Sequence, residues 1–304
     1  MFQKLINNFY YGKSGKGDFR KEDLPTTRTQ LFWEMLRIRF AGLVRLNLMY
    51  AVVWLPAMVV LLLTMLGILN AAQPTEQAAD LTANLRGVLM TTLLLLVPCI
   101  TITGPVTAGV SYVTRNWARD EHAFVWADFR DAIKDNWKQA LPVSFITGLM
   151  PLLVYVSWIF YSTMAQSSPL MMIPQYLVLF LGLVWALSVS YAHPLLVSYQ
   201  LPLKGILKNA LLLGIGRLPI SLGLRLLHLV PAAIAFGAAL LWNPLWASLL
   251  LFTYYLLIGF ALSRFITASV TNAVFDKVIN PHIPGAVVNR GLNTDVDDDD
   301  DDEN

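Results

Sequence analysis

Charged residues of both signs gather in one short stretch of an otherwise apolar chain. Residues 115–138 hold five acids and five bases. Among them, Glu121, His122 and Asp128 are of the types that serve as general acids, general bases or metal ligands. No second histidine stands at metal-ligand spacing, and the single cysteine, Cys99, lies inside an apolar run. We therefore expect no metal site, no cofactor and no enzyme activity.

Three further residues could do chemistry of a different kind. Ser221, Arg225 and His228 are spaced four and three residues apart inside an apolar segment, so a helix would place them on one face. Ionisable residues inside a membrane helix are candidates for function. One interpretation is an arginine that reaches the membrane interface and a histidine bonded to a backbone carbonyl. The other is a cationic spot that lines an interior cavity for an anionic or sugar-like solute.

The composition indicates the elements that must position these residues. Of the 304 residues 56% are hydrophobic and 14% are charged, against roughly 45–50% and about 25% in an ordinary soluble domain. A membrane-spanning helix needs about 20 mainly apolar residues. The sequence therefore predicts an all-α polytopic membrane protein with six transmembrane helices. The expected spans are about 46–69, 88–111, 142–164, 173–196, 219–241 and 244–263.

The distribution of basic residues predicts the topology. With these six spans, 20 of the 22 lysines and arginines fall in the two termini and in loops 112–141 and 204–218, all on one side. Short cytoplasmic loops are enriched in these residues. Both termini should therefore be cytoplasmic.

The two ends differ from the middle of the chain. We expect residues 1–25 to be a mobile basic arm, 26–284 the membrane domain, and 285–304 a disordered acidic tail with eight acids in its last ten residues. Thr27 and Gln30 have the spacing of a capping box, which predicts an interfacial helix before the first span. The basic body favours contact with anionic lipid headgroups rather than with nucleic acid.

Amphipathic helices are expected in the two basic loops, which we term elbows. In the first elbow, Phe129, Ile133 and Trp137 recur every four residues and form an apolar ridge, with Trp126 nearby. This ridge could bind a partner protein, lie in lipid headgroups, or pack against the protein's own spans. Further along, the apolar run 170–203 is too long for one straight crossing, so a break is expected at His193–Pro194.

Three segments resemble a known family. They are GPVTAGVSYVTRNWARDEHAFVWADFRDAIKDNWKQALP (104–142), LKNALLLGIGRLP (207–219) and, more weakly, FWEMLRIRFAGLVRLNL (32–48). Their order is similar to that in the YesL-like family of bacterial integral membrane proteins. The residues that match its pattern are Gly104, Pro105, Thr107, Ala108, Tyr112, Arg115, Arg119, Glu121, Phe129, Lys134, Asn136, Lys138 and Gln139.

The resemblance implies a multi-pass protein of the bacterial cell membrane. The family has no settled activity, and its genes often lie near those for carbohydrate uptake and degradation. The leading expectation is therefore a non-enzymatic accessory or scaffold protein, linked to carbohydrate uptake, that docks a partner through elbow 112–141. The alternative is a small-solute transporter with its site near Arg225 and His228.

Overall fold

The chain is built from long helices. The structure, a computed structural model, describes residues 25–71 and 78–293, and no strand occurs among them. The helices are α2 (Arg28–Ile38), α3 (Phe40–Ala71), α4 (Ala78–Trp117), α5 (Val125–Ala165), α6 (Met172–Ser198), α7 (Leu203–Gly216), α8 (Leu218–Leu241), α9 (Pro244–Tyr254) and α10 (Phe260–Val278). A π-helical turn, Tyr255–Gly259, joins α9 to α10, and short 3-10 turns lie at Pro169–Met171 and Asn280–His282.

Six helical segments are long and apolar enough to cross a membrane, which confirms the predicted fold class. Only 6% to 17% of the most apolar window of each segment is buried inside the protein. A water-soluble protein would bury far more of such surface, whereas lipid tails solvate it at no cost. The chain is therefore a multi-pass membrane protein. The spanning segments are 40–70, 81–117, 125–165, 169–198, 218–241 and 244–282.

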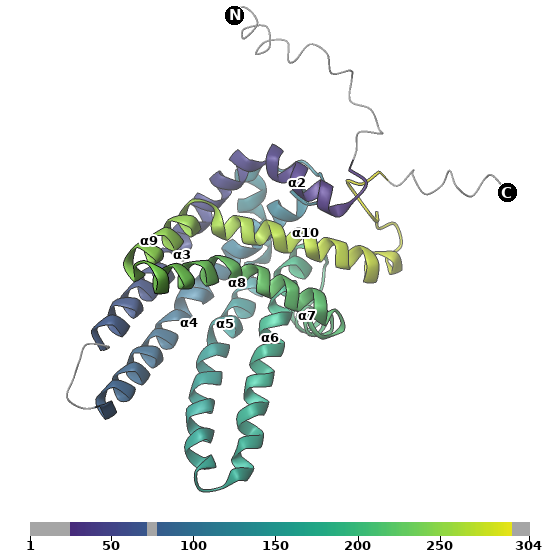
Figure 1. Cartoon of the computed structure of the whole chain (residues 1–304). Coiled ribbons are helices and arrows are strands. Elements are labelled where there is room, and N and C mark those ends of the chain that lie inside the picture. The colour runs from purple at the N-terminus through teal and green to yellow at the C-terminus, as the bar shows by residue number, and fades with distance from the viewer. Residues whose placement is uncertain (1–24, 72–77, 294–304) are drawn as a thin grey trace, which may run out of the picture.

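The spanning helices form three hairpins, α3 with α4, α5 with α6, and α8 with α9 and α10. Figure 1 shows that the first two hairpins come together near α2 and α7 and spread apart toward their turns, while the third hairpin lies across them. We call the place where they meet the α2 end. Two clusters of buried residues hold it together, one around Leu46, Trp117 and Phe265 and the other around Tyr191 and Phe275.

The first elbow is not a separate helix. Helix α5 runs without interruption from Val125 to Ala165, so the elbow and the third span form one rod, with Pro142 and Pro151 inside it. The second elbow does form a helix of its own, α7, because Pro202 precedes it and Pro219 begins the next helix. Proline supports the first turn of a helix but cannot continue one from its N-terminal side.

The break expected at His193–Pro194 is wrong. Helix α6 continues through Pro194 to Ser198, and Tyr199 then adopts an extended conformation. Tyr191 and Leu195 on either side of the proline are fully buried. Packing on neighbouring helices therefore outweighs the loss of one backbone hydrogen bond, as is common for prolines in membrane helices.

The predicted capping box at the start of α2 is confirmed. The Thr27 hydroxyl accepts a hydrogen bond from the Gln30 backbone, and the Gln30 side chain accepts one from the Thr27 backbone. Leu31 and Met35 are buried, and the Phe32 ring stacks on Phe265 of α10 at 5.1 Å. Helix α2 thus packs on the spanning helices.

The expected terminal arm and tail fall mostly outside the described residues. Of the expected tail 285–304, residues 285–293 are described, and they contact the α2 end. The Asn289 backbone donates to Asp276 at 3.2 Å, and the Asn293 backbone donates to the Pro25 carbonyl at 2.9 Å. Arg290 forms an ion pair with Glu121 at 3.0 Å.

A candidate anion-binding cavity

A cavity of about 750 Å³ lies among the spanning helices. Helices α3, α4, α5, α6, α8, α9 and α10 all contribute to its wall. Each of them uses residues three or four positions apart, because only one face of a helix can turn toward a shared interior. On α8, for example, the lining residues are Arg225, His228 and Ala232. The size is in the range of cavities that hold small ligands.

The titratable lining groups other than tyrosines are all nitrogen bases. They are His193 of α6, Arg225 and His228 of α8, and Arg264 of α10, and no aspartate or glutamate among the described residues lines the cavity. The nearest acid on α10 is Asp276, twelve residues beyond Arg264, which corresponds to about 18 Å along the helix. In the part of the chain that the structure describes, the cavity wall therefore offers the guanidinium charges no carboxylate counter-ion.

Both arginines have hydrogen-bonding capacity to spare. Arg225 donates from Nη2 to the Ala186 carbonyl and to the Ser190 hydroxyl, while its Nε is buried without a partner. Among the described residues, Arg264 makes no hydrogen bond and no ion pair. An arginine offers five N–H donors in a planar fork that suits carboxylate and phosphate groups. The two side chains can therefore bind an anion.

The two histidines are held by neutral partners. Nε2 of His228 lies 3.1 Å from the Ser263 carbonyl, to which it donates, and 3.3 Å from the Thr267 hydroxyl. Nε2 of His193 lies 3.4 Å from the Ser144 hydroxyl, and its buried Nδ1 has no partner. These contacts orient both rings at the cavity wall.

Of the three residues expected on one face of the fifth span, two line the cavity. Arg225 and His228 do so, whereas Ser221 is fully buried and hydrogen-bonds with the Tyr191 hydroxyl at 3.0 Å. His228 also makes the backbone-carbonyl contact of the first interpretation, because its Nε2 lies 3.1 Å from the Ser263 carbonyl oxygen. The structure adds the cavity beside it.

The sequence did not predict the contributions of His193 and Arg264. The sequence predicts a break at His193–Pro194, and Arg264 follows the expected end of the sixth span at residue 263. In the structure Arg264 lies in the first turns of α10, inside the spanning segment 244–282. The sequence does contain a signal for Arg264, because Ser263 and Thr267 beside it have the spacing of polar residues on one helical face.

The rest of the cavity wall is apolar. On α3 the lining residues run from Tyr50 to Met65, and on α9 from Leu245 to Phe252. Tyr50 lies at the edge of the polar part, where its hydroxyl hydrogen-bonds with the Thr107 hydroxyl of α4 at 2.7 Å. The indole nitrogen of Trp54, one turn further along α3, is buried without a partner. The cavity thus has a polar region around the arginines and an apolar arm between α3 and α9.

The ridge of the first elbow packs on the protein itself. Phe129 is only 6% exposed and belongs to the cluster around Trp117, and Ile133 packs against the same cluster. A Cβ on Gly109 of α4 would lie 2.7 Å from the Phe129 carbonyl, so the two helices touch there. Phe129 is therefore not available to a docking partner, and Ile133 is half-buried. Trp126 and Trp137 are exposed, at 62% and 46%.

Several residues of the matched pattern hold α4 against its neighbours. A Cβ on Gly104 would lie 2.6 Å from the Ala140 carbonyl of α5, so only glycine allows this approach. Ala108 is fully buried, and Thr107 both bonds with Tyr50 and lines the cavity. Pro105 lies within α4.

Other residues of the pattern connect helix ends. Arg115 donates to the Val197 carbonyl of α6 at 2.7 Å and lies over the ring of Tyr112 at 4.9 Å. Gln139 donates to the Leu201 carbonyl at 3.0 Å. Asn136 donates to the Ala132 carbonyl in its own helix. Lys134 and Lys138 are exposed.

The acids of the first elbow take part in structural contacts. Glu121 lies 3.4 Å from Arg119 and 3.0 Å from Arg290. Asp128 accepts a hydrogen bond from the Phe124 backbone at 2.8 Å, which caps the start of α5. The ring of His122 packs edge-on against Phe124. In the part of the chain that the structure describes, no group of three His, Cys, Asp or Glu residues could hold a metal ion.

A polar cluster at the α2 end joins the first helix to the last. Arg28 of α2 forms an ion pair with Asp276 of α10, which also accepts from Asn280. Burial lowers the pKa of Arg28, and the Asp276 carboxylate opposes this effect. Burial and then Asp276 raise the pKa of Tyr199 to about 12, so its hydroxyl stays protonated and donates to Asn280 at 2.7 Å.

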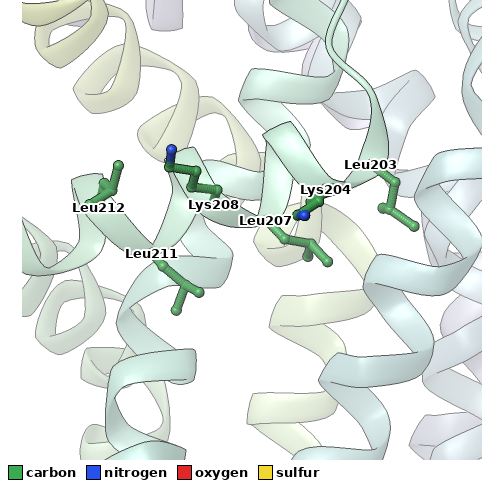
Figure 2. A pocket seen from close by; sticks show the side chains of 6 residues that line it. All are labelled: Leu203, Lys204, Leu207, Lys208, Leu211 and Leu212. Atoms are coloured by element: carbon green, nitrogen blue, oxygen red, sulfur yellow. The ribbon is translucent and has the colours of Figure 1, made fainter.

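The outer face of α7 combines lysines with leucines. Figure 2 shows Lys204 and Lys208 among Leu203, Leu207, Leu211 and Leu212 along this one helix. The hollow that they line is shallow and open. Lysines beside exposed leucines are typical of a helix at the membrane surface, where the charges meet lipid headgroups and the leucines meet acyl chains.

The fold and the cavity define a multi-pass α-helical membrane protein with an interior cationic cavity. Residues 82–158 match the model of a family described as "Protein of unknown function, DUF624". That segment covers most of α4 and α5, including Gly104, Arg115 and the first elbow. No curated protein and no solved structure matches the chain.

Proposed function

We propose that this membrane protein binds an anionic solute in its interior cavity and moves it across the bilayer. The observation that carries the proposal is the convergence of Arg225 and Arg264 on one cavity whose wall, within residues 25–71 and 78–293, contains no carboxylate. A charge removed from water is costly unless it is paired. Two arginines with donors to spare, inside spanning helices, are therefore a site for negative charge.

The proposed function is transport rather than catalysis. Glu121, His122 and Asp128, the residues best suited to acid–base chemistry, are engaged in contacts at the α2 end and do not line the cavity. The cavity wall instead offers hydroxyls, imidazoles and guanidinium groups from α4, α5, α6, α8 and α10. Such groups bind an anion through hydrogen bonds and release it again without a chemical step.

Binding of small anions tests this proposal. The protein would be placed in phosphatidylcholine nanodiscs and titrated calorimetrically with benzoate and glycerol phosphate, with neutral glycerol for comparison. We expect Arg225→Gln and Arg264→Gln each to weaken anion binding by about tenfold or more, the typical effect of losing a charge-assisted hydrogen bond. Arg86→Gln is the matched control, since Arg86 is an exposed arginine of a spanning segment that does not line the cavity. Equal binding by all variants would contradict the proposal.

A second candidate function is that of an accessory protein at the cytoplasmic face of a bacterial cell membrane. It is favoured by the exposed tryptophans Trp126 and Trp137 on α5, because exposed aromatic side chains are enriched at interfaces with proteins and lipids. A link to carbohydrate uptake rests on the resemblance of residues 104–142 to YesL-like proteins. The matched segment 82–158 includes this region.

The accessory function has its own test. Replacing both Trp126 and Trp137 by alanine should abolish co-purification of a transporter subunit and leave membrane insertion unchanged, since both side chains are exposed. Lys134→Gln with Lys138→Gln is the control for a merely electrostatic contact, which contributes little at exposed sites. Co-purification that persists in the tryptophan variant would exclude docking through α5.

A further inference from the structure

The cavity is divided into two chemically different parts. Its polar part contains the cationic groups together with hydroxyls of α4, α5, α6 and α10, such as Thr107, Ser144 and Ser190. Its apolar arm is lined by one face of α3 (Met58, Leu61, Leu62 and Met65) and by Leu245, Leu249 and Phe252 of α9. A small hydrophilic anion would fill the first part and leave the second empty.

The apolar arm extends well beyond the cationic part. From Tyr50, which bonds with Thr107 in the polar part, to Met65 there are fifteen residues of α3, or about 22 Å along the helix axis. No charged side chain lines this distance on α3 or on α9. A ligand that fills the cavity therefore has one polar end and a long apolar remainder.

The arm also reaches the surface of the protein. Leu61 and Leu249 line the cavity and are still 53% and 41% exposed. Both belong to spanning segments, 40–70 and 244–282, whose outward faces are apolar. The arm thus opens toward the acyl chains of the bilayer between α3 and α9, and a ligand that is dissolved in the bilayer can enter from the side.

We infer that the ligand is a single-chain anionic amphiphile, with a carboxylate or phosphate headgroup at Arg225 and Arg264 and an apolar chain along α3 and α9. This inference rests on the proposed anion-binding function and names its substrate class. A cavity of about 750 Å³ suits one chain, since cavities of about 300–1,000 Å³ hold ligands of drug-like size. The guanidinium groups select the negative headgroup, and the arm selects the chain.

Photo-crosslinking in phosphatidylcholine nanodiscs tests the inference. The probe is palmitate that carries a diazirine in its chain, and adducts are located by peptide mass spectrometry. We expect saturable adducts on residues 58–65 of α3 and 245–252 of α9. Unlabelled palmitate and hexadecyl phosphate should compete with the probe, whereas neutral hexadecanol should not. Equal competition by hexadecanol would overturn the assignment of the headgroup.

Two variants separate the two parts of the cavity. Leu249→Trp places a bulky side chain in the arm at an exposed position, where folding tolerates it. It should weaken palmitate binding about tenfold or more, because part of the palmitate chain would no longer be buried in the arm. Benzoate binding should not change, because the cationic groups are intact. Arg225→Gln should weaken the binding of palmitate and of benzoate. Arg225→Lys, which keeps the positive charge, should bind both ligands more tightly than Arg225→Gln does. Palmitate binding that is unaffected by Leu249→Trp would overturn the inference.

The outcomes also distinguish this inference from the proposed function. If benzoate and glycerol phosphate bind as tightly as palmitate, the amphiphile is excluded and the anion site stands. If no anion binding depends on Arg225 or Arg264, the proposed function and the amphiphile inference both fail. Native mass spectrometry of the protein purified from membranes identifies the bound ligand. A retained fatty acid or alkyl phosphate supports the inference, and a retained two-chain phospholipid overturns it.

Discussion

At the scale of single residues, this protein depends on close approach between helices. Gly104 and Gly109 of α4 face carbonyl groups of α5, and at both positions a Cβ would lie less than 3.0 Å from backbone atoms of the other helix. Small residues are favoured at such contacts because lipid provides no hydrophobic force between helices, so that association depends on close packing. The resemblance at Gly104 and Ala108 thus has a structural cause.

The Gly104→Ala variant should be clearly less stable than the native protein. The added Cβ would meet the Ala140 carbonyl at 2.6 Å and the Ser144 hydroxyl at 2.8 Å, and overpacking of this kind costs about 1–3 kcal/mol. Because Ser144 contacts His193, anion binding should weaken as well. The measurement is the thermal unfolding midpoint in detergent, together with benzoate titration.

Gly223→Ala is the matched control for this variant. Gly223 lies in the spanning helix α8, and nothing lies within 4 Å of the position of its Cβ. Alanine there should be neutral or stabilise by up to about 1 kcal/mol, because glycine is the weaker helix former. Similar unfolding midpoints for the two variants would show that α4 and α5 are not in the contact described.

At the scale of elements, one ion pair links the two ends of the described chain. Arg28 of α2 and Asp276 of α10 are 248 residues apart in sequence, and the pair is largely shielded from solvent. The Asp276 carboxylate also accepts from Asn280 and from the Asn289 backbone, so it organises the residues that follow α10. Removing the carboxylate would leave the half-buried Arg28 guanidinium without its counter-ion.

The Asp276→Asn variant should therefore release α2 from the spanning helices. We expect a loss of about 1–3 kcal/mol, the typical cost of an uncompensated buried polar or charged group. Hydrogen exchange of residues 28–38, followed by mass spectrometry, measures the local opening. The spanning segments themselves should keep their protection.

Asp131→Asn is the control for the same chemical change at an exposed site. Asp131 pairs with Arg130 at 3.2 Å, and both side chains are more than half exposed. Exposed pairs contribute only about 0–1 kcal/mol, so exchange in α2 should not change. Equal exchange in the two variants would exclude Asp276 as the anchor of α2.

At the scale of the whole molecule, six helical segments are long and apolar enough to cross a membrane. Its aromatic residues are consistent with two interfaces, because Trp33, Trp126 and Trp137 are exposed on α2 and α5, and Trp242 and Trp246 are exposed around the α8–α9 turn. Tryptophan is enriched at both faces of a bilayer. The orientation follows from the basic residues and remains a prediction.

Cysteine accessibility in intact cells checks the orientation. In a Cys99→Ala background, Lys134→Cys on α5 should be protected from an impermeant maleimide, because the basic elbow should face the cytoplasm. Ser167→Cys, in the turn between α5 and α6, should react. Both positions are exposed in the structure, so burial does not explain a difference. Labelling of Lys134→Cys and not of Ser167→Cys would show that the orientation is opposite to the predicted one.

The sequence by itself was sufficient to predict the class of the protein. Apolar windows bounded by charges predict six spans, because the length of an apolar helix must match the bilayer. The capping box at Thr27 and Gln30 is likewise local, since it depends on residues three positions apart. The shared face of Arg225 and His228 follows from helical periodicity alone.

Only the tertiary structure decided what these faces meet. His193 and Arg264 join Arg225 and His228 because three separate helices pack around one cavity, and no local pattern relates residues on different helices. The same reason decides the ridge on α5: its periodicity predicts an apolar face, but packing determines that Phe129 turns toward α4 while Trp137 remains exposed. In a membrane both surroundings are apolar, so hydrophobicity alone does not tell a lipid-facing residue from a buried one.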